Sequence, residues 1–236
     1  MNRLAPVLYA WLLLCVAPPV LAAAPSGVQA TYDVYRDGLK VGQIEETYTR
    51  DHERYTLSST TTPTGLLAVF RPEKIFIESA GLIGQQGLQP ERFSHRRERD
   101  ENKDSRAEFD WKERHLALTQ QAQRILLELP DGTQDRLSAM YQFMFLPLQK
   151  AAALDFAMTN GSKLDHYHYA ISRGQKLKTP AGEFRTLYLD NQAGAGENRT
   201  EIWLAVQHHN LPCKMVITDA DGEQLTQVLS RLIVVP

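Results

Sequence analysis

The stretch Arg106-Ala107-Glu108-Phe109-Asp110-Trp111 alternates charged and apolar side chains along its whole length. Successive side chains of a β-strand point to opposite faces of the sheet, so the apolar side chains would share one face and the charged side chains the other. One dry face and one wet face are typical of an antiparallel sheet that is covered on one side only. The stretch therefore predicts a strongly curved antiparallel sheet or an open barrel.

Similar β-like runs, separated by tight turns, continue on both sides of this stretch. We expect strands over residues 30–35, 75–79, 107–111, 125–129, 184–189, 201–206 and 215–218. Dipeptides that tolerate positive φ, and therefore suit tight turns, are Asp37-Gly38, Asp131-Gly132, Asn160-Gly161 and Asp221-Gly222. With softer loop signals they recur about every ten residues, the spacing of an antiparallel meander. We predict a mainly β protein built on a single sheet.

One or two short helices are expected to cover the mouth of this sheet. The clearer one spans residues 135–146, with Asp135 placed to cap its start and Pro147 to end it. Four of its side chains form one apolar stripe: Leu137, Met140, Tyr141 and Met144. A second apolar segment, residues 65–70, is either a short helix or a lid-like loop. Both segments could simply cover the core, or they could close the mouth of an apolar cavity.

The first 22 residues have the pattern of a secretory signal peptide, with a basic start, a short apolar segment and a small-residue exit. We expect cleavage after Ala22, export of the protein, and a single β-rich domain over residues 23–236. Cys15 follows the bulky Leu14 rather than a small residue, so we expect no lipid on Cys15. No other segment approaches the length of about 20 apolar residues that a membrane-spanning helix needs.

The composition narrows the range of possible partners and of covalent cross-links. The 236 residues carry a formal net charge of -2, and so weak an acidic balance argues against nucleic acid as a partner. Removal of the signal peptide leaves Cys213 as the single thiol, so no disulfide can form within the mature chain. A chain of roughly 200 residues buries about 70% of its unfolded surface and can fold on its core alone.

Two pairs of histidines raise the question of a metal site. His166 and His168 lie two positions apart and could share a metal if they lie on a strand. Tyr167 and Tyr169 would occupy the opposite face and are better core residues, which sends the two histidines toward solvent. The sequence has no His-Glu-x-x-His or Cys-x-x-Cys spacing. We therefore expect no metal site and no cofactor.

No nucleophile stands out either. Cys213 alternates with Met215 on one strand face, which favours a buried, inert thiol. A reactive thiol would need a base, and only His208 and His209 are near it in sequence. Ser138 lacks the Gly-x-Ser-x-Gly pattern of a nucleophile elbow. We assign no catalytic residue, and an enzyme is the weaker expectation.

Three segments carry a family resemblance when taken in order. They are Gly87-Leu88-Gln89-Pro90-Glu91-Arg92-Phe93 followed by Ala107-Glu108-Phe109-Asp110-Trp111, then Asp135-Arg136-Leu137-Ser138-Ala139-Met140-Tyr141, and finally Glu201-Ile202-Trp203-Leu204 with Leu211-Pro212-Cys213-Lys214-Met215. Together they resemble an exported family of Gram-negative bacteria, a domain of unknown function of the DUF3108 type. The resemblance implies a periplasmic protein with a strongly curved antiparallel sheet, similar to lipoprotein-carrier folds that hold acyl chains. It implies no catalytic residues.

We therefore expect a non-enzymatic periplasmic protein whose concave face binds a lipid or the acyl chain of a lipoprotein. The residues expected to line that space are Leu66, Leu67, Phe70, Met140, Tyr141, Met144 and Phe145. Methionine and aromatic side chains suit a tolerant apolar pocket because they repack around varied ligands. One alternative is a scaffold protein of the cell envelope that binds another envelope protein and has a filled core. A weaker alternative is a hydrolase whose site is assembled only in the fold.

Overall fold

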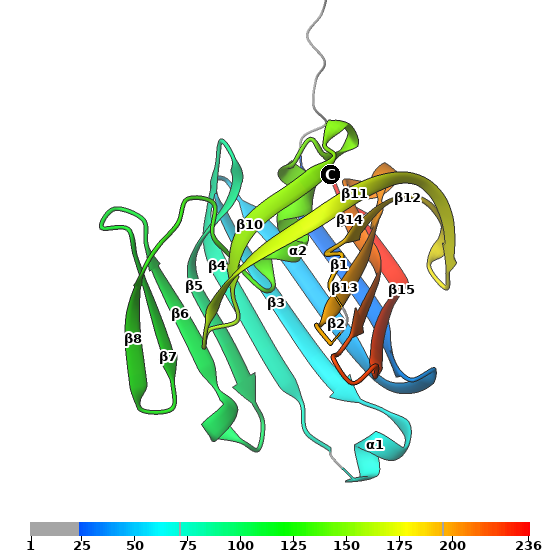
Figure 1. Cartoon of the computed structure of the whole chain (residues 1–236), viewed down its shortest axis with the longest axis horizontal. Coiled ribbons are helices and arrows are strands. Elements are labelled where there is room, and N and C mark those ends of the chain that lie inside the picture. The colour runs from blue at the N-terminus through cyan, green and yellow to red at the C-terminus, as the bar shows by residue number, and fades with distance from the viewer. Residues whose placement is uncertain (1–23, 71, 195) are drawn as a thin grey trace, which may run out of the picture.

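The structure is a computed structural model that describes residues 24–70, 72–194 and 196–236. One fifteen-stranded sheet dominates it, which confirms the prediction of a mainly β fold (Figure 1). The strands are β1 (Gly27–Arg36), β2 (Leu39–Asp51), β3 (Arg54–Pro63), β4 (Ile75–Gly84), β5 (Gly87–Arg97), β6 (Ser105–Asp110), β7 (His115–Gln120), β8 (Gln123–Glu128), β9 (Gln134–Asp135), β10 (Ala153–Thr159), β11 (Leu164–Thr179), β12 (Gly182–Asp190), β13 (Arg199–Ala205), β14 (Leu211–Thr218) and β15 (Gln224–Val235). The helices are α1 (Gly65–Phe70), α2 (Ser138–Gln142) and the 3-10 turns η1 (Glu101–Lys103), η2 (Phe143–Phe145), η3 (Leu148–Lys150) and η4 (Val206–His208).

The two ends of the described chain meet in the middle of the sheet. The strand order is β8-β7-β6-β5-β4-β3-β2-β1-β15-β14-β13-β12-β11-β10-β9. β1 pairs with β15 in antiparallel fashion from Gly27↔Val235 to Arg36↔Leu225, and Figure 1 shows these blue and red strands side by side. Every other neighbouring pair is consecutive in the chain, as expected of a meander. β9 pairs with β10 in parallel, whereas the other pairs are antiparallel.

All seven strands expected from the alternation are present, with ends that differ by a few residues. Residues 106–110 of the alternating stretch lie in β6, where Ala107 and Phe109 are buried and Glu108 is exposed. Trp111 lies one residue beyond the strand, stacks on Phe109 and donates its indole N–H to the Pro90 carbonyl at 2.6 Å. The prediction of one dry and one wet face is therefore confirmed for this strand.

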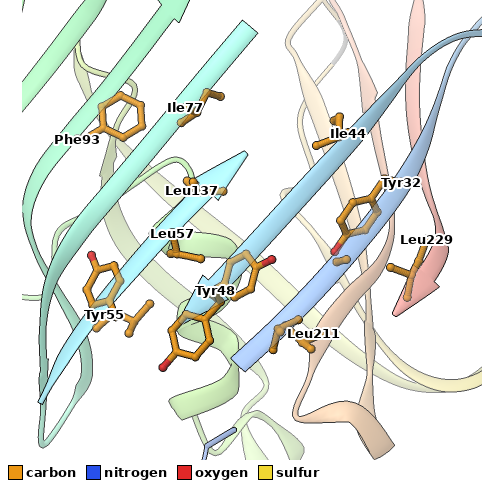
Figure 2. Close-up of a cluster of buried hydrophobic side chains, with 14 of the residues drawn as sticks. Tyr32, Ile44, Tyr48, Tyr55, Leu57, Ile77, Phe93, Leu137, Leu211 and Leu229 are labelled. Atoms are coloured by element: carbon orange, nitrogen blue, oxygen red, sulfur yellow. The ribbon is translucent and has the colours of Figure 1, made fainter. Parts of the chain in front are cut away.

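The core lies on the concave side of the sheet. Tyr32, Ile44, Tyr48, Leu57 and Ile77 come from four successive strands and project into one buried cluster (Figure 2). The sheet wraps around this cluster, because most of its strands direct alternate side chains into it.

β-Bulges help to curve the sheet. One of them interrupts the pairing of β4 with β5 between Ala80 and Gly81. A Cβ atom at Gly81 would lie 2.1 Å from the Gln89 carbonyl oxygen, so only glycine permits the two backbones to approach this closely.

The curled sheet does not close by backbone pairing. Side chains join its two arms instead: Gln134 Nε2 donates to the Leu88 carbonyl at 2.9 Å, and the Leu88 N–H donates to Gln142 Oε1 at 2.7 Å. Ser105 Oγ also donates to the Asn160 carbonyl at 2.9 Å. The result is an open, barrel-like sheet, as predicted.

The helix expected over residues 135–146 is shorter than predicted. Regular α-helix is confined to α2, and η2 follows it directly. Two features explain why the helix ends early. Asn210 Nδ2 donates to the Phe143 carbonyl at 3.3 Å. Leu146 is extended because it precedes Pro147, which disfavours helical backbone at that position.

The apolar segment at residues 65–70 is a helix, α1, rather than a loop. α1 packs against β2 and β3, whereas α2 packs against β5, β9 and β14. Figure 1 shows the two helices at opposite ends of the sheet, so they do not form one mouth. No helix in the described ranges is long and apolar enough to cross a membrane.

Candidate functional site

A cavity of about 360 Å³ lies on the concave side of the sheet, between β1–β5, β14–β15 and the start of α2. Apolar side chains form much of its wall, including Val34, Ile44, Ile75, Ile77, Met140 and Leu225. The alternation of β1, β2 and β4 positions most of them, because it directs every second side chain inward. The volume lies at the lower end of the range for small-molecule sites, about 300–1,000 Å³.

Five charged side chains interrupt this apolar wall: Arg36, Glu46, Glu73, Arg97 and Arg136. Arg97 Nη1 lies 3.0 Å from Glu73 Oε2, and Arg36 pairs with Glu223. Glu46, Glu73 and Arg97 are half-buried and lose part of their hydration, whereas Arg36 and Arg136 are exposed.

Glu46 is held by two neutral hydroxyl groups rather than by a cation. Tyr141 Oη donates to Glu46 Oε2 at 3.1 Å, and Ser59 Oγ donates to Glu46 Oε1 at 3.3 Å. Burial raises the pKa of Glu46 to about 7, although the two hydroxyls and the charge of Arg136 lower it. The carboxyl group therefore changes its charge near neutral pH.

Arg136 enters the cavity from the segment between β9 and α2, and a buried network holds that segment in place. Asp135, which is fully buried, accepts the N–H groups of Leu137 at 2.9 Å and Ser138 at 2.8 Å. Ser79 Oγ donates to the other carboxylate oxygen of Asp135 at 2.5 Å. The predicted capping role of Asp135 is confirmed, and the same contacts tie the base of Arg136 to β4.

A larger cavity of about 630 Å³ lies elsewhere, between the β4–β5 turn, η2 and β10. Phe145, Leu146, Trp111 and Phe156 line it together with the amide side chains of that turn. Gln142 crosses it to bond with the backbone of Gln86 and Leu88. These hydrogen bonds join the two arms of the sheet along its open seam, so this seam cavity is part of the closure of the fold.

The structure separates the seven residues expected to line a binding space. Met140 lines the concave cavity, Phe145 lines the seam cavity, and Tyr141 is fully buried against Glu46. Met144 packs against the core cluster. Leu66, Leu67 and Phe70 belong to α1, but their side chains lie outside the described part of the structure.

The histidines lie where the alternation placed them. His166 and His168 are exposed, whereas Tyr169 is buried on the opposite face of β11. His168 Nδ1 contacts Asp155 at 2.7 Å on the surface. Across the described ranges, no group of three or more His, Cys, Asp or Glu side chains is placed to hold a metal ion.

The thiol and the serine considered as nucleophiles are both buried. Cys213 is fully buried, its Sγ contacts the Trp203 carbonyl oxygen at 3.3 Å, and burial raises its pKa to about 12. Ser138 is also fully buried, and its hydroxyl bonds with the backbone of Asp135. The prediction of a buried thiol is confirmed.

Sequence reasoning missed the charged residues of the cavity. Glu46 was detectable in principle, because it lies between Ile44 and Tyr48 on the dry face of an alternating strand. Arg136 had no such signal, since it follows a two-residue strand and precedes a short helix.

Comparisons with known proteins place the chain in a family. The "Beta-barrel-like Protein of Domain of Unknown Function DUF1849 from Brucella abortus" has a similar fold, with a TM-score of 0.62, 12% identity and coverage of 91% of this chain and 100% of that chain. A "putative lipoprotein from Parabacteroides distasonis ATCC 8503" gives a TM-score of 0.37 and 11% identity, with coverage of 89% of this chain and 97% of that chain. No curated protein matches the chain. The sequence profile described as "Protein of unknown function (DUF3108)" matches residues 31–230, most of the chain, and confirms the resemblance carried by the three segments. The protein therefore belongs to the DUF3108 family.

Proposed function

We propose that this protein is a non-enzymatic carrier of the periplasm, which holds the apolar part of a lipid or lipoprotein acyl chain in its concave cavity. The observation that carries this proposal is the cavity itself, a space of about 360 Å³ with a largely aliphatic wall. A hollow of this size with a largely apolar wall has the volume and chemistry of a small-molecule site.

The end of the cavity near α1 adds support. Val41 and Pro63 line the cavity on the strands against which α1 packs. Leu39 and Val69 are exposed at that end, with 74% and 72% of their surface accessible. Exposed apolar side chains beside an apolar cavity suit the entry of an apolar ligand. We therefore keep α1, with Leu66, Leu67 and Phe70, as part of the proposed ligand-binding surface.

A cavity-filling variant tests the proposal. Ile75 lines the cavity and is half-buried, so Ile75→Trp should occupy the space that a ligand would take. We expect the wild-type protein to bind a fluorescent fatty acid and the variant to bind it at least about tenfold more weakly, because a 1.4 kcal/mol loss of binding energy is tenfold in affinity.

Ile125→Trp is the matched control, since Ile125 is exposed on β8, away from the cavity. It should bind the probe like the wild type. A wild-type protein that binds no apolar probe, and that carries no lipid when native mass spectrometry is applied to periplasmic material, would contradict the carrier function and favour the envelope scaffold.

A further inference from the structure

One cation in the concave cavity has no partner. Arg136 lines that space and is an exposed residue, and within the described part of the chain its guanidinium forms no hydrogen bond or ion pair. The other two arginines of the cavity are paired, Arg36 with Glu223 and Arg97 with Glu73. An accessible guanidinium without a partner, beside an apolar wall, is available to an anion that comes from outside the chain.

The carboxyl groups nearest to Arg136 are engaged elsewhere. One carboxylate oxygen of Asp135 accepts hydrogen bonds from two backbone N–H groups, and the other accepts one from the Ser79 hydroxyl. Glu46 accepts hydrogen bonds from Tyr141 and Ser59. Neither carboxyl group forms an ion pair with Arg136 among the described residues.

A second guanidinium faces the same space. Only one edge of Arg97 is used by Glu73, and its Nε–H is buried without a hydrogen-bond acceptor in the described ranges. The charge of Arg97 repels the charge of Arg136, whereas Glu46 and Asp135 attract it. Two like charges that repel each other across a cavity are both stabilised by an anion bound between them.

We propose that the ligand of the concave cavity is a single-chain amphiphile with an anionic head group, and that Arg136, assisted by Arg97, binds that head group. This inference rests on the proposed carrier function and adds the chemical class of the ligand. Carboxylate and phosphate oxygens both match the planar fork of donors that a guanidinium presents. The aliphatic wall of Ile44, Ile77 and Met140 contacts the chain, and about 360 Å³ suits one chain rather than two.

Displacement of cis-parinaric acid by three competitors of equal chain length tests the inference. The competitors are dodecanoate, dodecyl phosphate and dodecanol, applied to the full mature protein at neutral pH. We expect the wild type to prefer at least one anion over the alcohol by on the order of tenfold, the effect of a hydrogen bond to a charged group. The better of the two anions identifies the head group as carboxylate or phosphate.

The Arg136→Gln variant should lose this preference while its affinity for dodecanol stays unchanged. Arg106→Gln is the matched control, because Arg106 is exposed on the wet face of β6 and should retain the preference. Arg136→Lys keeps the charge without the fork and should fall between the two. It also covers the case in which the glutamine variant does not fold, as judged by circular dichroism.

The possible failures are distinguishable. Equal displacement by anions and alcohol, unaffected by Arg136→Gln or Arg136→Lys, would overturn the head-group site and leave the carrier function standing. Absence of any binding by the wild type would overturn both.

Discussion

Glu46 places a carboxyl group on the dry face of the sheet, beside Ile44 and Tyr48 on the same strand. Burial raises its pKa from 4.5 to about 7. The folded protein therefore retains this proton to a higher pH than the unfolded chain does. The free energy of unfolding should accordingly fall as the pH rises from 4.5 to 7, and the loss should be complete above that range.

Glu46→Gln should remove this pH dependence, because the amide is similar in size and does not ionise. Relative to the wild type, the variant should gain up to about 3 kcal/mol of unfolding free energy between pH 4 and pH 8, since one pKa unit corresponds to about 1.36 kcal/mol. Urea unfolding across that pH range measures the gain. Glu45→Gln is the control, because Glu45 is exposed on the opposite face. Parallel pH profiles for wild type and Glu46→Gln would show that the carboxyl group is not perturbed.

At the scale of single elements, the bulge in β4 depends on one glycine. The Gly81→Ala change would place a Cβ atom 2.1 Å from the Gln89 carbonyl oxygen, and the strands would have to separate. We expect a loss of about 1–3 kcal/mol in unfolding free energy, as for other overpacked sites. Gly84→Ala, on the same strand, is the control because the nearest atom to its Cβ would be 4.0 Å away. Equal stabilities for the two variants in chemical denaturation would contradict this account of the bulge.

Helix α2 and η2 carry two methionines with different surroundings. Both pack against the core cluster, but only Met140 also lines the concave cavity. Met144→Ala should cost roughly 2–5 kcal/mol, the usual range for truncation of a packed side chain. Met140→Ala should cost less, because its side chain already borders a void, and only this variant should change the affinity for a fatty-acid probe. Thermal unfolding and probe titration of both variants test this. A larger loss of stability in Met140→Ala, or a change of probe affinity in Met144→Ala alone, would contradict the assignment of the cavity.

At the scale of the whole molecule, the sheet curls until its two arms meet, and side chains rather than a backbone ladder join them. An open seam lets a sheet of this size enclose a cavity without the fixed strand tilt and stagger that a closed barrel requires. The core and the cavity therefore share one concave face.

The proposed carrier function also requires that the chain is exported. Residues 1–22 carry the signal-peptide pattern and lie outside the described residues. N-terminal sequencing of the protein from the periplasm should begin at Ala23. A mature chain that begins at an acylated Cys15 would contradict both the cleavage site and the absence of a lipid anchor.

Local patterns in the sequence were sufficient for the parts of the fold that depend on neighbouring residues. The alternation at residues 106–111 predicted a strand with one dry face, and dipeptides such as Asn160-Gly161 predicted turns that the structure contains. Asp135 was recognisable as a cap, because capping needs only an acceptor at the right distance from the next N–H groups. The sequence also placed His166 and His168 on the exposed face of their strand.

Only the tertiary structure decided what meets across the chain. The 3-10 geometry of η2 reflects a contact from Asn210, and a hydrogen bond joins Tyr141 to Glu46 over 95 positions of sequence. Periodicity assigns a side chain to a face, but the partner on that face depends on how the sheet curls. That curl brings Arg136 toward Glu46 and Arg97, and separates Met140 from Phe145, because packing of the whole concave face determines it.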